Sequence, residues 1–119
     1  MRKVESLRCT FCELQCENIY HLFYDCVKVR SVWKYVAESC TKLCNYVIHF
    51  NCKDVILEYV NDNVNSEKVL IINMVILYTK WYIMKCKFDL KHPTIHGLQR
   101  YLEGQGLIES QLVNILLQL

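Results

Sequence analysis

The sequence predicts a small all-α domain with a cysteine-rich N-terminal segment, and its composition supports this fold class. Three glycines and one proline in 119 residues are too few for the many turns of a β-sandwich or barrel. Hydrophobic residues make up 53% of the chain and charged residues 22%, which favours a buried core and excludes global disorder. Eight cysteines indicate either an oxidising compartment or a metal site.

Residues 27–46 are predicted to form the first long helix. Their apolar side chains recur at the i, i+3, i+4, i+7 spacing of one helix face. That face comprises Val29, Val32, Trp33, Val36, Cys40, Leu43 and Val47. A short second helix is expected over residues 53–60, where Val55, Ile56 and Tyr59 are apolar.

The longest predicted helix runs from Ser66 to about Lys87. The polar run 61–65 indicates a turn, Ser66 is the expected N-cap, and Glu67 suits a helix start. The span is about 33 Å at 1.5 Å per residue. A strand over residues 69–78 is an alternative because β-branched residues are common there, but the length and the absence of turn signals favour a helix.

The first half of this helix is apolar nearly all round, which predicts a central, buried position. We expect the residues on the strongest helical stripes to be buried together, namely Trp33, Val36, Leu70, Met74 and Leu77. The apolar stretch 69–79 is shorter than the about 20 residues of a membrane span, so no membrane association is expected.

Two further segments complete the helical prediction. Pro93 and Thr94 are expected to open a short helix that ends at Gly104 and Gly106. Its apolar face comprises Ile95, Leu98 and Leu102, and the last segment has a stripe at Ile108, Leu112, Ile115, Leu116 and Leu119. That stripe either closes the core or docks on another domain, because it would otherwise expose a large apolar area.

The N-terminal segment places four potential metal ligands in the pattern Cys9-x2-Cys12-x8-His21-x4-Cys26. A structural zinc site needs four nitrogen or sulfur ligands in a tetrahedron, and a C-x2-C turn presents two thiolates to one ion. No apolar region follows the basic N-terminus, so no secretory signal is expected, and zinc is a better explanation than disulfides. We therefore predict a zinc knuckle over residues 1–27, followed by a helical domain over residues 28–119.

The remaining cysteines leave alternatives open. Cys16 either replaces one of the zinc ligands or is a free thiol nearby. Cys40, Cys44, His49 and Cys52 form a second set that would suit a metal. Cys40 and Cys44 also continue the apolar stripe of the first helix, so thiols buried in the core are the better account of this set.

Nothing in the sequence indicates catalysis. It has no Ser-His-Asp set, glycine-rich phosphate loop or cluster of carboxylates, and no small-molecule substrate is expected. Cys86, His92 and His96 lack partners at a metal-binding spacing, and both histidines are expected on the surface.

The cysteine-rich motif resembles the zinc-binding motif near the C-terminus of non-LTR (LINE-type) retrotransposon reverse transcriptases. That family shares a short Cys pair, a His-Leu-Phe run, a following Cys and then a Trp. Its counterparts here are Cys9, Cys12, His21-Leu22-Phe23, Cys26 and Trp33. A later stretch is similar to the helix that follows in vertebrate-type elements, with Thr79-Lys80-Trp81, Lys85-Cys86-Lys87 and Pro93-Thr94 as the matching residues.

The two matches cover roughly residues 9–103, and Cys16 is an extra cysteine relative to the family pattern. The resemblance implies a non-catalytic C-terminal module, or a remnant of one, that helps a reverse transcriptase hold RNA or target DNA. A cytoplasmic or nuclear location is expected. The alternative is a structural module in which the knuckle staples the helices and the surface docks on the polymerase domain. An independent host protein derived from such an element is a third interpretation.

Local charge indicates where nucleic acid would bind, because the net charge of +2 is small. Residues 80–100 carry five expected phosphate contacts, namely Lys80, Lys85, Lys87, Lys91 and Arg100, against Asp89 alone. Residues 28–42 form a second basic segment. Phe11 is the expected base-stacking residue. The alternative is that these charges form a solvated helix face and that the aromatic residue belongs to a small knuckle core.

Overall fold

The computed structural model describes residues 8–104, and within them every regular element is helical. The elements are the short π-helical turn η2 (His21–Asp25), α1 (Val27–Cys44), α2 (Cys52–Ile56), α3 (Ser66–Asp89) and α4 (Ile95–Gly104). One isolated antiparallel bridge joins Arg8 to Cys16. The all-α prediction is therefore confirmed.

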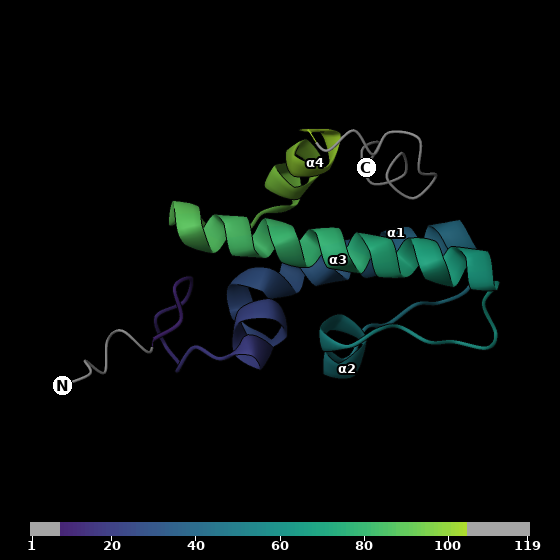
Figure 1. Cartoon of the computed structure of the whole chain (residues 1–119), viewed down its shortest axis with the longest axis horizontal. Coiled ribbons are helices and arrows are strands. Elements are labelled where there is room, and N and C mark those ends of the chain that lie inside the picture. Colours follow the sequence, from purple (N-terminus) through teal and green to yellow (C-terminus); the bar gives the residue numbers. More distant parts are fainter. Residues whose placement is uncertain (1–7, 105–119) are drawn as a thin grey trace.

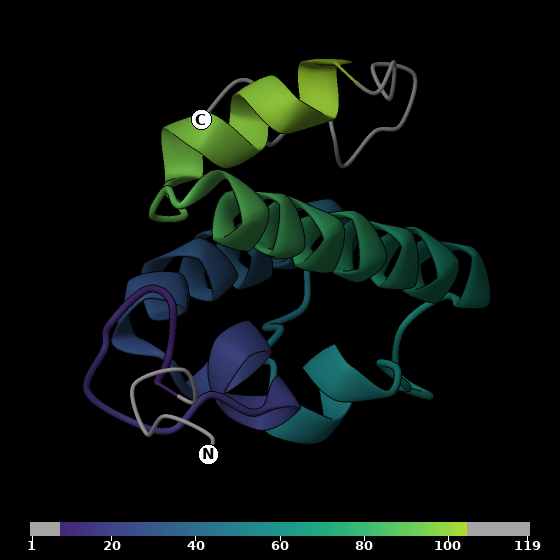
Figure 2. The same ribbon diagram turned by 60° about the vertical axis from the view of Figure 1, so that its left-hand side comes forward.

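Helix α3 is the central element of the fold (Figure 1). Helix α1 lies behind it, α4 lies along one edge, and η2 and α2 lie along the opposite edge, in both views (Figures 1 and 2). Contacts between α1, α3 and α4 join the three longest helices, and η2 contacts both α1 and α2. One hydrophobic cluster includes residues of the N-terminal loop, of η2 and of all four α-helices.

Helix α1 follows the sequence prediction to within two residues. Its N-cap is Cys26 in an extended conformation, and it ends at Asn45 in the left-handed region. Most of the predicted stripe is buried, but Leu43 is only half-buried and Val47 is exposed beyond the helix end. The Trp33 indole N–H donates to the carbonyl of Phe23, and the Trp33 ring meets Phe50 edge-on. Trp33 thus joins η2 to the loop after α1.

Two predicted boundaries are wrong. Helix α2 ends at Ile56, four residues before the predicted end, and starts with a reciprocal cap between Asn51 and Asp54. The N-cap of α3 is Asn65, whose side chain accepts from the Glu67 N–H at 2.7 Å, so Ser66 is the first helical residue. An asparagine caps a helix as well as a serine does, and the sequence offered both residues in succession.

The predicted core is right for α1 and wrong for α3. Trp33 and Val36 are buried, whereas Leu70, Met74 and Leu77 are 63%, 43% and 43% exposed. The buried face of α3 is the opposite one, formed by Ile72, Val75, Ile76, Thr79, Tyr82, Ile83 and Cys86. A helix that is apolar all round has no periodic signal to indicate which face packs inward, and the packing of α1 and α4 decides it.

One tyrosine of α3 makes two hydrogen bonds to the start of helix α4. The Tyr82 hydroxyl accepts from the Thr94 N–H at 3.0 Å and donates to the Thr94 carbonyl at 3.3 Å. The Thr94 side chain in turn accepts from the N–H of Gly97 and caps the helix. Leu98 and Leu102 are buried as predicted. The apolar stripe predicted from Ile108 to Leu119 lies outside the described residues.

By length and composition, α3 is apolar enough to cross a membrane. The sequence interpretation ended the apolar stretch at residue 79, but it resumes after Lys80 with Trp81, Tyr82, Ile83 and Met84. Core helices of soluble proteins pass the same test, and 39% of the apolar window is buried in this fold. The feature is therefore weak grounds for a membrane-spanning role.

Candidate metal centre and basic surface

The structure brings the four predicted metal ligands together. The donor atoms of Cys9, Cys12, His21 and Cys26 all lie within 4.8 Å of one another. The Cys9 and Cys26 Sγ atoms are 3.7 Å apart, and the Cys12 Sγ lies 3.3 Å from the His21 Nε2. A tetrahedral ion with metal–sulfur bonds of about 2.3 Å has sulfur–sulfur edges of about 3.8 Å. The four side chains therefore form a donor set that can hold a metal ion.

A tight turn presents the first two thiols. The N–H of Glu13 donates to the Cys9 carbonyl at 3.0 Å, and Glu13 has a left-handed backbone with φ of 58°. The N–H groups of Phe11 and Leu14 each point at a ligand sulfur, those of Cys9 and Cys12 respectively, at 3.4 Å. Such N–H donors stabilise thiolates, which are the form of cysteine that binds metals.

The other two ligands come from the two ends of η2. The Asn18 side chain accepts from the His21 N–H at 2.9 Å and fixes the start of this turn. The Cys26 N–H donates to the His21 carbonyl at 2.9 Å and closes it. Cys26 is also the N-cap of α1, so the fourth ligand is the residue from which the first long helix starts.

The His21 ring is oriented for metal binding through one nitrogen. Its Nε2 faces the Cys12 sulfur, whereas its buried Nδ1 has no hydrogen-bond partner among the described residues. Metal-binding histidines usually donate their second ring N–H to a carbonyl or carboxylate. The Nδ1 side of this ring therefore lacks the hydrogen bond that usually fixes a metal-binding histidine.

The thiols of the site differ in their electrostatic surroundings. Burial works to raise the pKa of Cys12, but the Leu14 N–H and the His21 ring outweigh it and lower that pKa to about 6. Burial, followed by the neighbouring Cys9 thiol, raises the pKa of Cys26 to about 12. Three thiols crowded together cannot all ionise without a cation among them, which is the electrostatic reason for this donor set to bind a metal.

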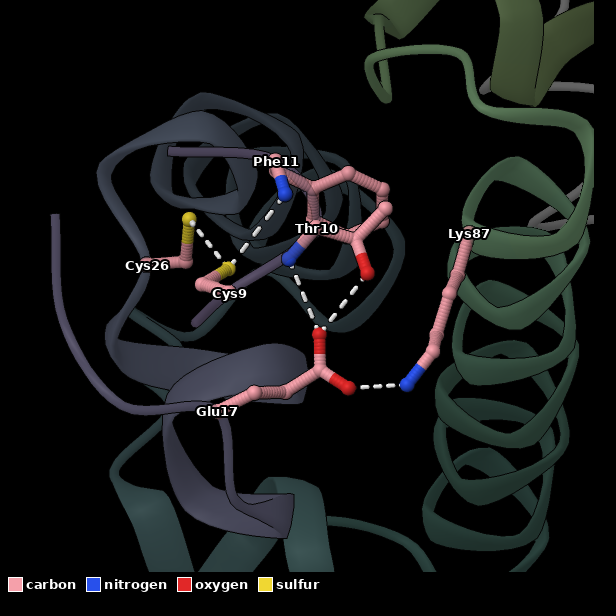
Figure 3. A network of polar contacts seen from close by, with 6 residues as sticks. All are labelled: Cys9, Thr10, Phe11, Glu17, Cys26 and Lys87. Atoms are coloured by element: carbon pink, nitrogen blue, oxygen red, sulfur yellow. Dashed lines mark hydrogen bonds and ion pairs between the residues drawn. The ribbon is translucent and has the colours of Figure 1, made fainter. Parts of the chain in front are cut away.

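A carboxylate ties this loop to the helical body (Figure 3). The Glu17 side chain accepts from both the N–H and the hydroxyl of Thr10, each at 2.9 Å, and pairs with Lys87 on α3. Burial alone would raise the pKa of Glu17, but the hydrogen bonds from Lys87 and Thr10 hold it below its usual value. No sequence pattern signals this contact, because its partners are 70 positions apart.

Phe11 is not placed for base stacking. Its ring is 2% exposed and belongs to the hydrophobic core, so the described conformation offers no face to a base. Between two ligands of a tight turn, one intervening side chain points inward, and the apolar Phe11 occupies that place while Thr10 faces Glu17. The knuckle-core alternative is the one that fits the structure.

The five predicted phosphate contacts fall into two groups. Lys80 is half-buried, with its ammonium group 3.5 Å from the Ile56 carbonyl and its pKa lowered by burial, and Lys87 pairs with Glu17. Lys85, Lys91 and Arg100 instead converge on a hollow of about 380 Å³ between α3 and α4. Lys80 and Lys87 are therefore not exposed, unpaired cations of the kind that the phosphate-contact prediction requires.

The hollow between α3 and α4 is lined by basic side chains and by the ring of Tyr101. Lys85, Lys91 and Arg100 line it together with His92, Tyr101 and the single carboxylate of Asp89. Asp89 pairs with Lys85 at 3.1 Å, and the Arg100 Nε donates to His96 at 2.9 Å. Sequence reasoning missed Tyr101, and its position one residue after Arg100 is the only signal that points to it.

A second, larger groove of about 1050 Å³ runs along α1. Its basic residues are Arg30, Lys34 and Lys42, and Asp25 and Glu38 lie among them. Arg30, Lys34, Glu38 and Lys42 recur every four residues, so they share one helix face. Positive charge in this groove is therefore interrupted by a carboxylate at each end of the Arg30–Lys34 pair.

The remaining cysteines do not form a second metal site within residues 8–104. Cys40 is fully buried and Cys44 and Cys52 are half-buried, while His49 is exposed. Burial raises the pKa of Cys40, Cys44 and Cys52, which keeps these thiols protonated. Cys16 is exposed and outside the ligand cluster, and His92 and His96 are exposed as predicted.

Comparison with protein-family models, with curated proteins and with solved structures finds no match to this chain. The geometry of the site is therefore the structural ground for a proposed function.

Proposed function

We propose that this chain is a zinc-stapled helical module that binds single-stranded nucleic acid through the hollow between α3 and α4. The zinc assignment is carried by the three-sulfur, one-nitrogen donor set at near-tetrahedral spacing. Zn²⁺ favours such sets, and its role in a closed four-ligand site is structural. Cys9, Cys12, His21 and Cys26 would hold the ion and thereby fix the loop that Glu17 joins to α3.

The convergence of three predicted cations on one hollow carries the nucleic-acid proposal. Lys91 and Arg100 are exposed there, and Lys85 shares its charge with Asp89. Phosphate contacts from such residues bind without reading sequence. The half-exposed ring of Tyr101 would supply the stacking surface that Phe11 does not offer. The alternative is a structural module, and the Glu17–Lys87 contact supports the part of it in which the knuckle staples the helices.

The resemblance of the knuckle and of the Lys80–Thr94 stretch to LINE-type reverse transcriptases supports the same proposal. In that setting the chain would be a non-catalytic C-terminal part that holds RNA or target DNA for an upstream polymerase domain. The module itself would contribute binding energy and position, and the chemistry would lie elsewhere in the parent enzyme.

Metal content tests the zinc part of the proposal. Purified protein analysed by elemental mass spectrometry should contain one zinc ion per chain. Replacement by Co²⁺ should give the absorption bands of tetrahedral coordination with thiolate ligands. Cys26→Ser should lose the metal, and the exposed Cys16→Ser should keep it. A zinc-free protein in which residues 9–26 are still folded would contradict this assignment.

Binding of a labelled single strand tests the nucleic-acid part. Fluorescence anisotropy of zinc-loaded protein, measured at several salt concentrations, should show binding that weakens as salt increases. Lys91→Gln with Arg100→Gln should reduce the slope of log K against log salt by roughly 1.4, at about 0.7 per lost phosphate contact. Tyr101→Leu should weaken binding and leave the slope unchanged, because stacking releases no counterions.

A charge-matched pair of changes on α1 is the control. Arg30→Gln with Lys34→Gln removes the same number of charges from the other groove and should leave the slope near that of the parent. If the slope decreases more in this control than in the Lys91→Gln, Arg100→Gln variant, the strand binds along α1, and the proposed site is wrong. Absence of any binding by zinc-loaded protein at low salt would overturn nucleic-acid binding and leave the docking role.

A further inference from the structure

Helix α3 exposes a second apolar face along its whole length. Its exposed large hydrophobic residues are Leu70, Met74, Leu77, Trp81 and Phe88, and Met84 between them is half-buried. We call this set the outer stripe. It extends over about 27 Å at 1.5 Å per residue. An apolar strip of this extent on a soluble protein marks an interaction site, because isolated exposed hydrophobic residues do not line up in this way.

The spacing of the outer stripe is that of a coiled-coil seam. Successive members are four, three, four, three and four residues apart, which is the alternation of a and d positions in a heptad repeat. The residues of the opposite face, such as Ile72 and Ile83, pack into the core. In Figure 1, α3 crosses the near side of the molecule, and no described element lies in front of it. A second helix can therefore lie along this face.

We propose that two copies of this chain associate through the outer stripe, with their α3 helices antiparallel. A pairing centred between Leu77 and Trp81 places Leu77 against Trp81 of the second copy. It also places Leu70 against Phe88 of the second copy and Met74 against its Met84. Each aromatic side chain then meets a smaller aliphatic one, and the two methionines adapt to each other. A parallel pairing would instead stack Trp81 on Trp81 and Phe88 on Phe88.

The charges at the two ends of the outer stripe favour the antiparallel arrangement. Glu67 lies at the N-terminal end, one turn before Leu70. The C-terminal end near Phe88 carries Lys85, Lys87 and Lys91. Lys85 pairs with Asp89 and Lys87 with Glu17, so Lys91 is the cation of this end that has no carboxylate partner among the described residues. Antiparallel pairing brings Glu67 of each copy to the basic end of the other, whereas parallel pairing brings like charges together.

Lys80, which flanks the middle of the outer stripe, does not oppose this pairing. Its ammonium group lies 3.5 Å from the Ile56 carbonyl, on the α2 side of the helix. The symmetric contact is of the isologous type, in which one surface patch meets its own copy. The seam contributes six side chains from each copy, fewer than the roughly 20–30 residues per partner of a standard interface, so we expect a weak dimer with a dissociation constant on the order of 10 µM.

Sedimentation equilibrium of the full zinc-loaded chain tests the association. Over about 1 to 200 µM, a range that brackets the expected constant, the parent should change from mainly monomer to mainly dimer. Leu77→Glu should remain monomeric throughout, because it buries a charge at the centre of the seam. Leu57→Glu is the matched control, since Leu57 is 70% exposed outside the outer stripe, and it should associate like the parent. Circular dichroism should show that both variants are folded.

The orientation is tested with one charge reversal. Glu67→Lys should weaken the antiparallel dimer about three- to fivefold at low salt, because it adds a positive charge to a basic end. In a parallel dimer Glu67 faces Glu67 of the second copy, and the same change makes this a contact between two lysines. Both contacts are repulsive, so the dissociation constant should not change. Glu58→Lys, at an exposed position outside α3, is the control and should have no effect.

Two results would overturn the proposal. One is a parent that stays monomeric up to 200 µM, a concentration about 20-fold above the expected constant. If that monomer also binds vesicles of neutral phosphatidylcholine, the outer stripe serves a membrane surface instead. The other is a dimer that Leu77→Glu leaves intact. The proposal does not rest on nucleic-acid binding, so its failure and the failure of the proposed function are separate results.

Discussion

The carboxylate of Glu17 and the ammonium group of Lys87 form an ion pair between the knuckle loop and α3 (Figure 3). The same carboxylate receives two hydrogen bonds from Thr10, inside the turn that carries the first two ligands. One side chain thus connects the metal-binding turn to the longest helix. The contact also explains why Lys87, which the sequence places among the phosphate contacts, is not a free cation.

Glu17→Gln should lower the free energy of unfolding by about 1 kcal/mol. The amide keeps the shape of the side chain and loses the charge that attracts Lys87, and partly exposed pairs of this kind contribute little more than that. Urea denaturation of the zinc-loaded protein measures the change. Glu13→Gln, at an exposed position in the same loop, is the control and should be nearly neutral.

The pH dependence of this effect has a definite sign. The pKa of Glu17 is lower in the folded protein than in the unfolded chain, so its contribution is complete above the unfolded pKa. It is lost only as the pH falls through the lower, folded pKa. The stability difference between the parent and Glu17→Gln should therefore be constant from about pH 8 to pH 5.5, above the usual carboxylate pKa of about 4.3. A difference that shrinks within this range would show that another group is responsible.

Removal of the metal should unfold the knuckle before the helices. Zinc can contribute about 10–16 kcal/mol of apparent binding energy at neutral pH in small motifs, far more than the few apolar side chains of residues 8–20. Hydrogen exchange in the presence of a chelator should accelerate at residues 9–26 and remain slow in the middle of α3. Added zinc should reverse the change. Equal acceleration in α3 would mean that the helices depend on the metal as much as the loop does.

Gly97→Ala should destabilise the packing of α4 on α3 by about 2 kcal/mol or more. A Cβ atom at this position would lie 2.1 Å from the Tyr82 hydroxyl, which would have to leave its two hydrogen bonds to Thr94. Gly104→Ala is the control, because a Cβ atom there meets nothing within 4 Å. Thermal melts that rank the two alanine variants in the reverse order would contradict this account.

Leu90→Gly should stabilise the fold by about 0.5–1 kcal/mol. Leu90 ends α3 in the left-handed region with φ of 57°, and its side chain is exposed, so it carries the strain without a packing gain. Glycine adopts this conformation without that cost, although it also increases the entropy of the unfolded chain. Chemical denaturation measures the net change. A loss of stability would mean that the leucine side chain makes a contact that offsets its backbone strain.

The sequence predicted the features that rest on local spacing. The ligand positions follow from two short pairs, and the extent of α1 follows from a clear apolar period at Val29, Val32 and Val36. The order and type of the four α-helices in the described residues were predicted as well, whereas the π-helical turn η2 was not. In each case the residues that decide the outcome are neighbours along the chain.

The features that rest on tertiary packing were not predicted. The outer stripe and the buried face of α3 are both apolar, so only the positions of α1 and α4 show which face is inside. Phe11 was expected to stack on a base because it lies between two ligands in the sequence, and the structure buries it in the core instead. The contact of Lys87 with Glu17 has no counterpart in any local pattern.

The separation of contacts along the chain sets an order of assembly during synthesis. The Cys9 and Cys26 sulfur atoms are 17 positions apart, whereas the partners of the Glu17–Lys87 ion pair are separated by 70. Short-range contacts form sooner than long-range ones, and N-terminal parts fold first as a chain leaves the ribosome. The four ligands can thus take up a metal ion before α3 has been translated. The knuckle would then already be folded when α3 packs against it.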